Sequence, residues 1–301
     1  MIDLRVNVAG VQLNSPIVTA SGTFGNGKEY SRFIDLNRLG AITAKGLSHE
    51  AWPGNPPPRI AETYGGMLNA VGLQNPGAKK FIEDDLPFLK NFSAKVIVNL
   101  CGRTVEDYIA VARDFDGVSG VDFFELNISC PNVKAGGMAM GTSAKMAEEV
   151  TRAVKNIAKI PLIVKLSPNV TDIVEIAKGA AAGGADALCL INTLLGMKID
   201  IHKKKPVLGN KIGGLSGPAI KPVAVRMVWQ VAKAVDLPII GTGGVATWED
   251  AIEFIVAGAT AVSVGTANFA NPCATMEILD GIDAYMKENN LSNLSEIRGI
   301  V

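Results

Sequence analysis

The segment 125–132, Glu-Leu-Asn-Ile-Ser-Cys-Pro-Asn, contains the side chain with the strongest catalytic potential in this sequence. Cys130 stands three residues beyond Asn127, where a predicted buried strand ends, so its thiol is expected at the edge of a sheet. A free thiol has a pKa of about 8.5, and a modest decrease would make it a usable base near neutral pH. Cysteines are more often buried and inert, but this position favours a chemical role.

Polar side chains and glycine turns follow the ends of eight predicted strands. In a (β/α)8 barrel these ends meet on one face, where the active site lies. Glycine turns after the last two strands, with segment 213–217 as a third wall, are typical of a phosphate site built from backbone N–H groups. In chain order the strand-end residues are Ser21, Lys45, Asn99, Asn127, Lys165, Asn192 with Thr193, Gly243-Gly244 and Gly265-Thr266.

Two of these residues, Lys45 and Lys165, are cations directly after apolar strands. They are either solvated charges on the barrel rim or functional groups. A functional lysine could form a Schiff base, bind a substrate carboxylate, or place positive charge beside a flavin and favour its reduced, anionic ring. Glu125 has no second carboxylate beside it, and both histidines fall in predicted loops. A glycosidase pair or a metal site is therefore not expected.

Short apolar runs alternate with helical patterns, which predicts an α/β fold, a (β/α)8 TIM barrel that occupies residues 1–301 as one domain. We expect Ser143 to cap a helix over 144–158, and Thr247 with Asp250 to begin one over 248–257. An open doubly wound sheet is the structural alternative, but no G-x-G-x-x-G follows the first strand. The predicted strands are Ile17–Ala20, Ala41–Ala44, Val96–Asn99, Phe123–Asn127, Leu162–Lys165, Ala187–Ile191, Ile239–Gly241 and Ala261–Val264.

Four segments fall outside this regular alternation. A short N-terminal β-hairpin is predicted over residues 3–13, outside the barrel. Three long βα connections, at 46–95, 128–143 and 192–219, are predicted as loop insertions. Long loops in a compact domain are usually functional, so we expect them to contribute to the site.

Composition and charge narrow the function classes. Lys plus Arg equals Asp plus Glu at 29 each, which argues against a nucleic-acid surface, and the run Lys203-Lys204-Lys205 is expected to be a solvated loop. The sequence predicts neither a signal peptide nor a membrane span, so a cytoplasmic location is expected. The four cysteines form no C-x-x-C pair, and no metal or cluster site is expected on this chain.

Several segments together resemble the class 1 dihydroorotate dehydrogenases. Residues 127–134, Asn-Ile-Ser-Cys-Pro-Asn-Val-Lys, are similar to the catalytic loop of these enzymes, and residues 67–77 are similar to their substrate loop. The resemblance extends from about residue 4 to residue 275. Further similar segments, in the same order, are 166–169, 191–193, 214–218 and 241–245.

Residues 69–77 and 130–137 resemble class 1B, the NAD-linked form. This resemblance implies one FMN on this chain. It also implies a partner, an electron-transfer subunit that carries FAD and a [2Fe–2S] cluster, in a heterotetramer built on a homodimer of catalytic subunits. The quinone-linked class 2 uses serine as its base, whereas this chain has Cys130.

The resemblance implies a role for each residue in oxidising (S)-dihydroorotate to orotate during pyrimidine (UMP) biosynthesis. Cys130 would take the C5 proton, and hydride would pass from C6 to FMN. The implied substrate-binding residues are Lys45, Asn69, Ala70, Val71, Gly72, Leu73, Asn127, Asn132, Asn192 and Thr193. The implied FMN-binding residues are Ser21, Lys45, Gly46, Asn99, Asn127, Lys165, Ile191, Gly217, Gly243, Gly244, Gly265 and Thr266.

Four alternative functions stay open on the sequence. One is a fumarate-linked, class 1A-like enzyme, and another is an FMN-dependent pyrimidine oxidoreductase such as the pyrimidine-reducing domain of dihydropyrimidine dehydrogenase. That domain normally accompanies many cluster-binding cysteines, which this sequence lacks. The third is a flavin-free lyase that uses Lys45 or Lys165. The fourth, a flavin module that only relays electrons, does not account for Cys130.

Overall fold

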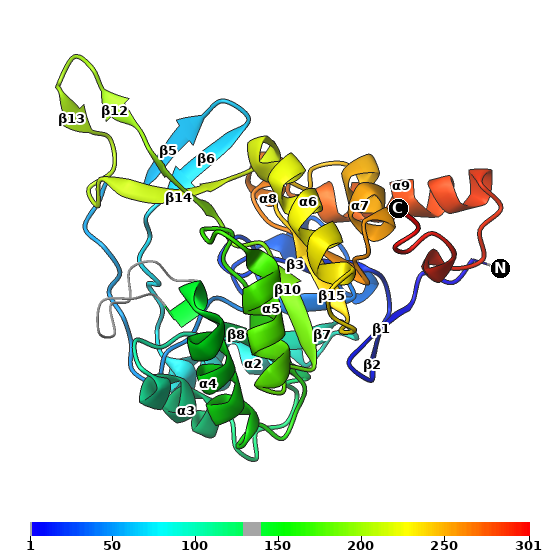
Figure 1. Ribbon diagram of the computed structural model, residues 1–301, viewed down its shortest axis with the longest axis horizontal. Helices are drawn as coiled ribbons and strands as arrows, with labels where there is room; N and C mark the ends of the chain where they lie inside the picture. Colours follow the sequence, from blue (N-terminus) through cyan, green and yellow to red (C-terminus); the bar gives the residue numbers. More distant parts are fainter. Residues whose placement is uncertain (1, 129–139) are drawn as a thin grey trace.

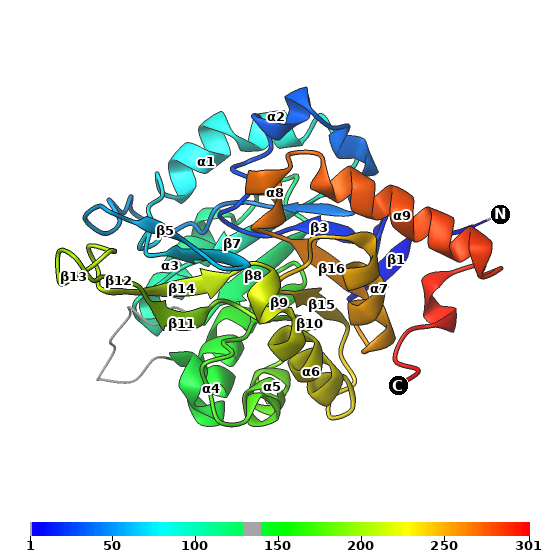
Figure 2. The ribbon, with the colours of Figure 1, turned by 90° about the horizontal axis from the view of Figure 1, so that it is seen from above.

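The computed structural model describes residues 2–128 and 140–301. Eight parallel strands form a closed barrel and hydrogen bond in the order in which they follow one another along the chain (Figure 2). Each strand lies within one residue of its predicted bounds, so the predicted barrel is confirmed. The strands are β3 (Ile17–Thr19), β4 (Ala41–Thr43), β7 (Lys95–Leu100), β8 (Phe123–Asn127), β9 (Leu162–Lys165), β10 (Ala187–Leu190), β15 (Ile239–Thr242) and β16 (Ala261–Val264).

Helices surround the barrel (Figures 1 and 2), so its strands are buried on both faces and consist mostly of apolar residues. The first crossover is an exception, because two 3₁₀ turns, η1 (Tyr30–Arg32) and η2 (Leu36–Arg38), stand there in place of an α-helix. The helices are α1 (Ala78–Asp84), α2 (Leu86–Leu89), α3 (Val105–Asp114), α4 (Ala144–Lys155), α5 (Ile173–Ala182), α6 (Lys221–Ala232), α7 (Trp248–Val256), α8 (Ala267–Ala270) and α9 (Ala274–Glu288). The remaining 3₁₀ turns are η3 (Met140–Thr142), η4 (Pro218–Ile220) and η5 (Leu294–Glu296).

The two predicted helix starts have different outcomes. At α7 the capping box is present, because Asp250 Oδ2 accepts a hydrogen bond from the Thr247 N–H at 2.9 Å and the Thr247 hydroxyl accepts one from the Asp250 N–H. At α4 the prediction is partly wrong. Ser143 occupies the N-cap position, but its hydroxyl accepts no bond from the helix; its carbonyl accepts the first helical bond, from Ala147 N–H at 2.9 Å. This helix also ends at Lys155, before residue 158.

The N-terminal hairpin is confirmed as β1 (Val6–Val8) paired antiparallel with β2 (Val11–Leu13). Ala9 and Gly10, at the turn, have φ angles of 50° and 85°, as a two-residue hairpin turn of type I′ requires. The hairpin is tied to the barrel by Val8 and Leu13, which belong to the main hydrophobic core.

Two of the connections predicted as long loops contain strands, which corrects that prediction. Residues 46–95 contribute β5 (Ile60–Thr63) and β6 (Gly66–Asn69), and residues 192–219 contribute β11 (Leu194–Met197) and β14 (Ile212–Ser216). These four strands form an antiparallel sheet, here called the outer sheet, in the order β11-β14-β6-β5. A ribbon of β12 (Ile199–Asp200) and β13 (Lys205–Pro206) extends from it (Figure 1). Lys203 and Lys204 are exposed at the tip, as expected of a solvated run.

The outer sheet has one buried and one open face. Leu68 of β6 lies in a small core of its own with Ala61, Ala70 and Leu208. On the other face, Met197 stands directly opposite Ile212 on the neighbouring strand, and each side chain is about half exposed (49%). The face with Met197 also carries Asn69 and Gly214. Both residues lie at the ends of the barrel strands, so the outer sheet contributes to the site.

Candidate functional site

A pocket lies at the carboxyl ends of the barrel strands, and residues at the end of every strand line it. Lys45 follows β4, Asn99 lies near the end of β7, and Lys165 is the last residue of β9. The residues expected there from the sequence that line this pocket are Ser21, Lys45, Gly46, Asn69, Ala70, Val71, Gly72, Leu73, Asn99, Asn127, Lys165, Ile191, Asn192, Thr193, Gly217, Gly243, Gly244, Gly265 and Thr266. Cys130 and Asn132 lie outside the described residues.

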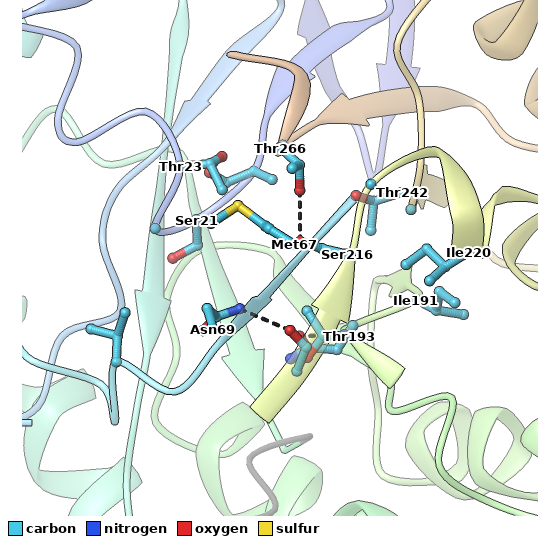
Figure 3. Close-up of a pocket in the computed structure, with 18 of the residues that line it drawn as sticks. Ser21, Thr23, Met67, Asn69, Ile191, Thr193, Ser216, Ile220, Thr242 and Thr266 are labelled. Carbon is cyan, nitrogen blue, oxygen red and sulfur yellow. Dashed lines mark hydrogen bonds between the residues drawn. The ribbon is translucent and has the colours of Figure 1, made fainter. Parts of the chain in front are cut away.

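The outer sheet forms one wall of this pocket. Asn69 on β6 stands opposite Gly214 on β14, and its Nδ2 donates a hydrogen bond to the Gly214 carbonyl at 3.4 Å (Figure 3). A Cβ atom on Gly214 would lie 2.1 Å from the Thr193 hydroxyl oxygen, so this strand approaches the barrel end as closely as it does only because residue 214 is glycine. The wall therefore places Asn69 and Thr193 on the same part of the pocket.

Amide groups are held in fixed positions on the barrel side. Asn192 Nδ2 donates to Asn127 Oδ1 at 3.4 Å, and Asn192 Oδ1 accepts from the Thr193 N–H at 2.7 Å. Below them, the buried Tyr108 hydroxyl donates to the Asn127 carbonyl at 2.6 Å. An amide side chain both donates and accepts, so this arrangement is suited to a flat polar ring with N–H and C=O groups on its edge.

Glycine turns form the opposite end of the pocket, after β15 and β16. Gly244 has a φ of 80°, and a Cβ there would lie 2.8 Å from the Gly217 carbonyl oxygen, so the two turns pack backbone to backbone. Beside them, the Thr266 hydroxyl donates to Ser216 Oγ at 2.7 Å (Figure 3). Exposed backbone and hydroxyl groups without bulky side chains allow an anionic group to approach closely, which is the chemistry of a phosphate site.

A buried ion pair, formed by residues of β8 and β9, lies below the pocket, away from the glycine turns. Lys165 Nζ is 3.8 Å from Glu125 Oε2, and Asn99 Nδ2 donates a short hydrogen bond to the same carboxylate oxygen. Burial is the largest single effect on the pKa of Lys165 and lowers it, but the charge of Glu125, the nearby Cys189 and Cys101 side chains and the hydrogen bond to Glu125 together raise the pKa overall. Lys165 is therefore held as an ammonium ion, which is a poor nucleophile, and this disfavours a Schiff-base role for it.

Sequence reasoning overlooked several residues that line the pocket. Met67 and Ser216 come from the outer sheet, whose strand pairing was not predicted, although both stand in segments that carried the family resemblance. Thr23 and Phe269 lie beyond strand ends, after β3 and β16 respectively. No local pattern distinguishes these two from ordinary loop residues, so only the folded arrangement reveals them.

In residues 2–128 and 140–301, no three side chains of His, Cys, Asp or Glu come together in a group that could hold a metal ion. Across the same part of the chain, no helix combines the length and the apolar character needed to cross a membrane.

Comparison with known proteins places the chain in a family. A sequence profile described as dihydroorotate dehydrogenase matches residues 3–286. The chain belongs to the dihydroorotate dehydrogenase family. Two relatives, each named dihydroorotate dehydrogenase B (NAD(+)), catalytic subunit, are 64% identical over 298 residues in Alkaliphilus metalliredigens (99% of this chain, 98% of the relative) and 60% identical over 300 residues in Lachnoclostridium phytofermentans (100% of each).

A third relative of the same name, from Alkaliphilus oremlandii, is 65% identical over 297 residues, which cover 99% of this chain and 98% of the relative. These names confirm the resemblance to the NAD-linked class of dihydroorotate dehydrogenases that the sequence indicated. The family is one of oxidoreductases, and the name "catalytic subunit" implies that these relatives work with a partner subunit.

Proposed function

We propose that this chain oxidises (S)-dihydroorotate to orotate as one catalytic domain over residues 1–301, in the cytoplasm and in pyrimidine biosynthesis. The observation that carries the proposal is the convergence, in one pocket, of every described residue that the family resemblance implicates. The fixed amides suit the substrate, because orotate and dihydroorotate are rings with N–H and C=O groups on their edges. Family membership over residues 3–286 supports the same reaction.

Within this proposal Cys130 is the base that removes the C5 proton of dihydroorotate. Asn127, Asn192 and Thr193 orient the ring from the barrel side, while Asn69 and the segment 70–73 orient it from the outer-sheet side. Asn132, which lies outside the described residues, is proposed as a further substrate-binding residue. Lys45 supplies positive charge for the substrate carboxylate and the cofactor. Holding the ring between the two sides fixes the C5 hydrogen relative to the base, which general-base catalysis requires.

The pocket also fits FMN. The glycine turns at Gly217 and Gly243–Gly244 line the pocket with backbone and no side chains, with Gly265 and Thr266 beside them, as a phosphate site requires. Ser21, Gly46, Asn99, Lys165 and Ile191 line the part of the pocket that would hold the ring and ribityl chain. FMN, when bound, supplies a ring that accepts hydride from C6 of the substrate.

We further propose that electrons leave through a partner, an electron-transfer subunit with FAD and a [2Fe–2S] cluster that reduces NAD+. The expected assembly is a heterotetramer of two catalytic and two electron-transfer subunits. Support comes from the names of the relatives, which specify NAD(+) and a catalytic subunit. Efficient fumarate reduction by the isolated chain, without NAD activity on adding the partner, would instead identify a fumarate-linked enzyme.

The deciding experiment is a visible spectrum of the purified chain, followed by anaerobic mixing with dihydroorotate in a stopped-flow instrument. A flavin spectrum that bleaches on mixing is the expected result. A flavin spectrum that does not bleach rules out dihydroorotate oxidation. A colourless chain that is trapped by borohydride with substrate supports the lyase alternative.

The role of Cys130 is tested by Cys130→Ala. This variant should bind FMN but reduce it about 10²–10⁴-fold more slowly, the usual contribution of a general base. Cys273→Ala is the matched control, because Cys273 is a free cysteine outside the pocket lining. A reduction rate in Cys130→Ala close to that of the control would contradict the assignment.

A further inference from the structure

Glu125 on β8 is a carboxylate buried inside the barrel, just below the pocket. Its side chain is 4% exposed, and two of its polar neighbours, Lys165 and Asn99, line the pocket. The interior of a (β/α)8 barrel is normally filled by branched apolar side chains. Glu125 is thus an exception that lies next to the proposed flavin site.

Packing alone does not explain the pair. Removing two charges from water costs free energy, and replacing a buried ion pair by apolar residues is often neutral or stabilising. Among the ion pairs of the described residues, Glu125–Lys165 is the one in which both side chains are less than a tenth exposed; in the next most buried pair, Lys221–Asp250, they are 26% and 14% exposed. A functional reason for retaining the pair is therefore expected.

Glu125 also determines the orientation of Asn99. The Asn99 Nδ2 donates to Glu125 Oε2, while its Oδ1 accepts a hydrogen bond from the Cys101 thiol at 3.4 Å. The two ends of an amide are chemically different, so these two bonds fix which end faces which neighbour. Without the carboxylate, the Asn99 amide could rotate and present a different group to the pocket.

The charge balance under the pocket depends on the same residue. Cys189 lies against the pair, but burial raises the pKa of its thiol well above the ordinary value, so it remains neutral. Cys101 is likewise buried, and its thiol donates to Asn99. Among the ion pairs of the described residues, Glu125 is the carboxylate that pairs with the ammonium of Lys165.

We propose that Glu125 is a positioning residue that orients Asn99 and Lys165 towards the flavin ring and, by balancing the charge of Lys165, limits the preference of the site for reduced flavin. This inference rests on the FMN-binding function proposed above. A reduced flavin carries negative charge on its ring when anionic. A buried carboxylate close by disfavours that charge, and the neutral isostere Gln would not.

The test measures the reduction potential of bound FMN in wild type and in Glu125→Gln, at pH 6, where Lys165 is protonated. The variant should bind reduced relative to oxidised FMN at least about tenfold more tightly than wild type, which is about 30 mV for a two-electron couple. Glu125→Asp keeps the charge and should keep the potential, while weakening FMN binding in both states because Asn99 is released. Glu288→Gln, an exposed change at the end of α9, is the matched control.

A second comparison uses Lys165→Gln as the background, where Glu125→Gln should again favour reduced flavin, because removing the carboxylate removes its repulsion of the anionic ring whether or not the cation is present. The comparison of Lys165→Gln with the double variant also tests the proposal if Glu125→Gln alone does not fold, since the double variant contains no unbalanced buried charge. Equal loss of affinity for both flavin states, with an unchanged potential in Glu125→Gln, would indicate a merely structural role and overturn the proposal. A wild-type chain that binds no FMN overturns both proposals.

Discussion

The barrel and the outer sheet bury their apolar side chains in different ways. Barrel strands follow one another along the chain, are parallel and are buried on both faces. The outer sheet joins two segments that are far apart in sequence, and it buries one face on a core of four residues while leaving Met197 and Ile212 half exposed on the other. The barrel, whose strands are buried on both faces, contains the buried Glu125–Lys165 pair, whereas the less protected outer sheet supplies one wall of the pocket.

This difference indicates that the barrel provides most of the stability, whereas the outer sheet adds one wall to a site that the barrel strand ends also line. A large shared core resists local opening, and elements with few buried apolar contacts open at lower free energy. Substitutions in each region should therefore differ in size and in how far their effects spread. Four such tests follow from the structure.

The largest effect is expected in the barrel core. Phe254 of α7 is fully buried and contacts β15 near Gly241, where a Cβ would lie 2.5 Å from its ring. Phe254→Ala should lower the free energy of unfolding by about 3–5 kcal/mol, as measured by urea denaturation, because it leaves a cavity in the shared core. Phe33→Ala, at a side chain 59% exposed, is the control and should have a far smaller effect.

A smaller and more local effect is expected for Leu68→Ala in the core of the outer sheet. Loss of about 2 kcal/mol there should speed amide hydrogen exchange about 30-fold in β5, β6, β11 and β14. Exchange in the barrel strands should stay as in wild type. An equal increase throughout the barrel would mean that the two regions unfold as one unit, and the comparison would fail.

A pH-dependent effect is expected where the connection to the outer sheet is tied to the barrel. His49 Nδ1 lies 2.8 Å from Asp114 on α3, and this hydrogen bond, with the charge of Asp114, raises the pKa of His49. Because the folded-state pKa is raised, the stabilisation is complete below about pH 6.5, the unfolded value, and is lost as the pH rises through the folded-state pKa.

His49→Gln should therefore lower the free energy of unfolding at pH 5.5, by less than about 1 kcal/mol because the pair is exposed. At pH 9 the substitution should have almost no effect. Urea midpoints at both pH values, with Asp114→Asn in parallel, provide the measurement. A difference between wild type and variant that grows with pH would contradict the assignment.

The smallest effect is expected on the open face of the outer sheet. Met197→Gln should change the free energy of unfolding by less than about 0.5 kcal/mol, because the side chain is already half in water. Urea denaturation of the isolated chain, beside Leu68→Ala, gives the contrast between the two faces. A cost comparable to that of Leu68→Ala would show that this face is buried in solution.

Sequence patterns predicted the barrel because its information is local. Each strand is a short apolar run and each pairs with its neighbours in the chain, so bounds such as Phe123–Asn127 and Ala261–Val264 agree with the structure. The capping box at Thr247 was likewise readable, since its two residues are three apart. At Ser143 the residue type alone was insufficient, since this residue occupies the N-cap position but its hydroxyl accepts no hydrogen bond from the helix.

The outer sheet was not predicted, because its pairing is non-local. Asn69 pairs with Gly214, which is 145 positions away in the sequence, and no pattern within either segment predicts which segment it pairs with. The same reason explains which residues of the pocket could be predicted. Strand-end residues such as Lys45 and Lys165 were expected in one pocket, whereas Met67 and Ser216 were recognised as lining residues only once the strands were paired.

Closure of the barrel has a consequence for the synthesis of the protein. The last strand, β16, pairs with the first, β3, so Val264 hydrogen bonds beside Thr19. A ribosome releases the chain from its N-terminus onward. The first seven barrel strands therefore leave the ribosome before β16, and without β16 their sheet has two open edges. The pocket, with residues from Ala20 to Phe269, is incomplete on any nascent chain that ends before Phe269. The cofactor and substrate sites thus form together, after translation of nearly the whole chain.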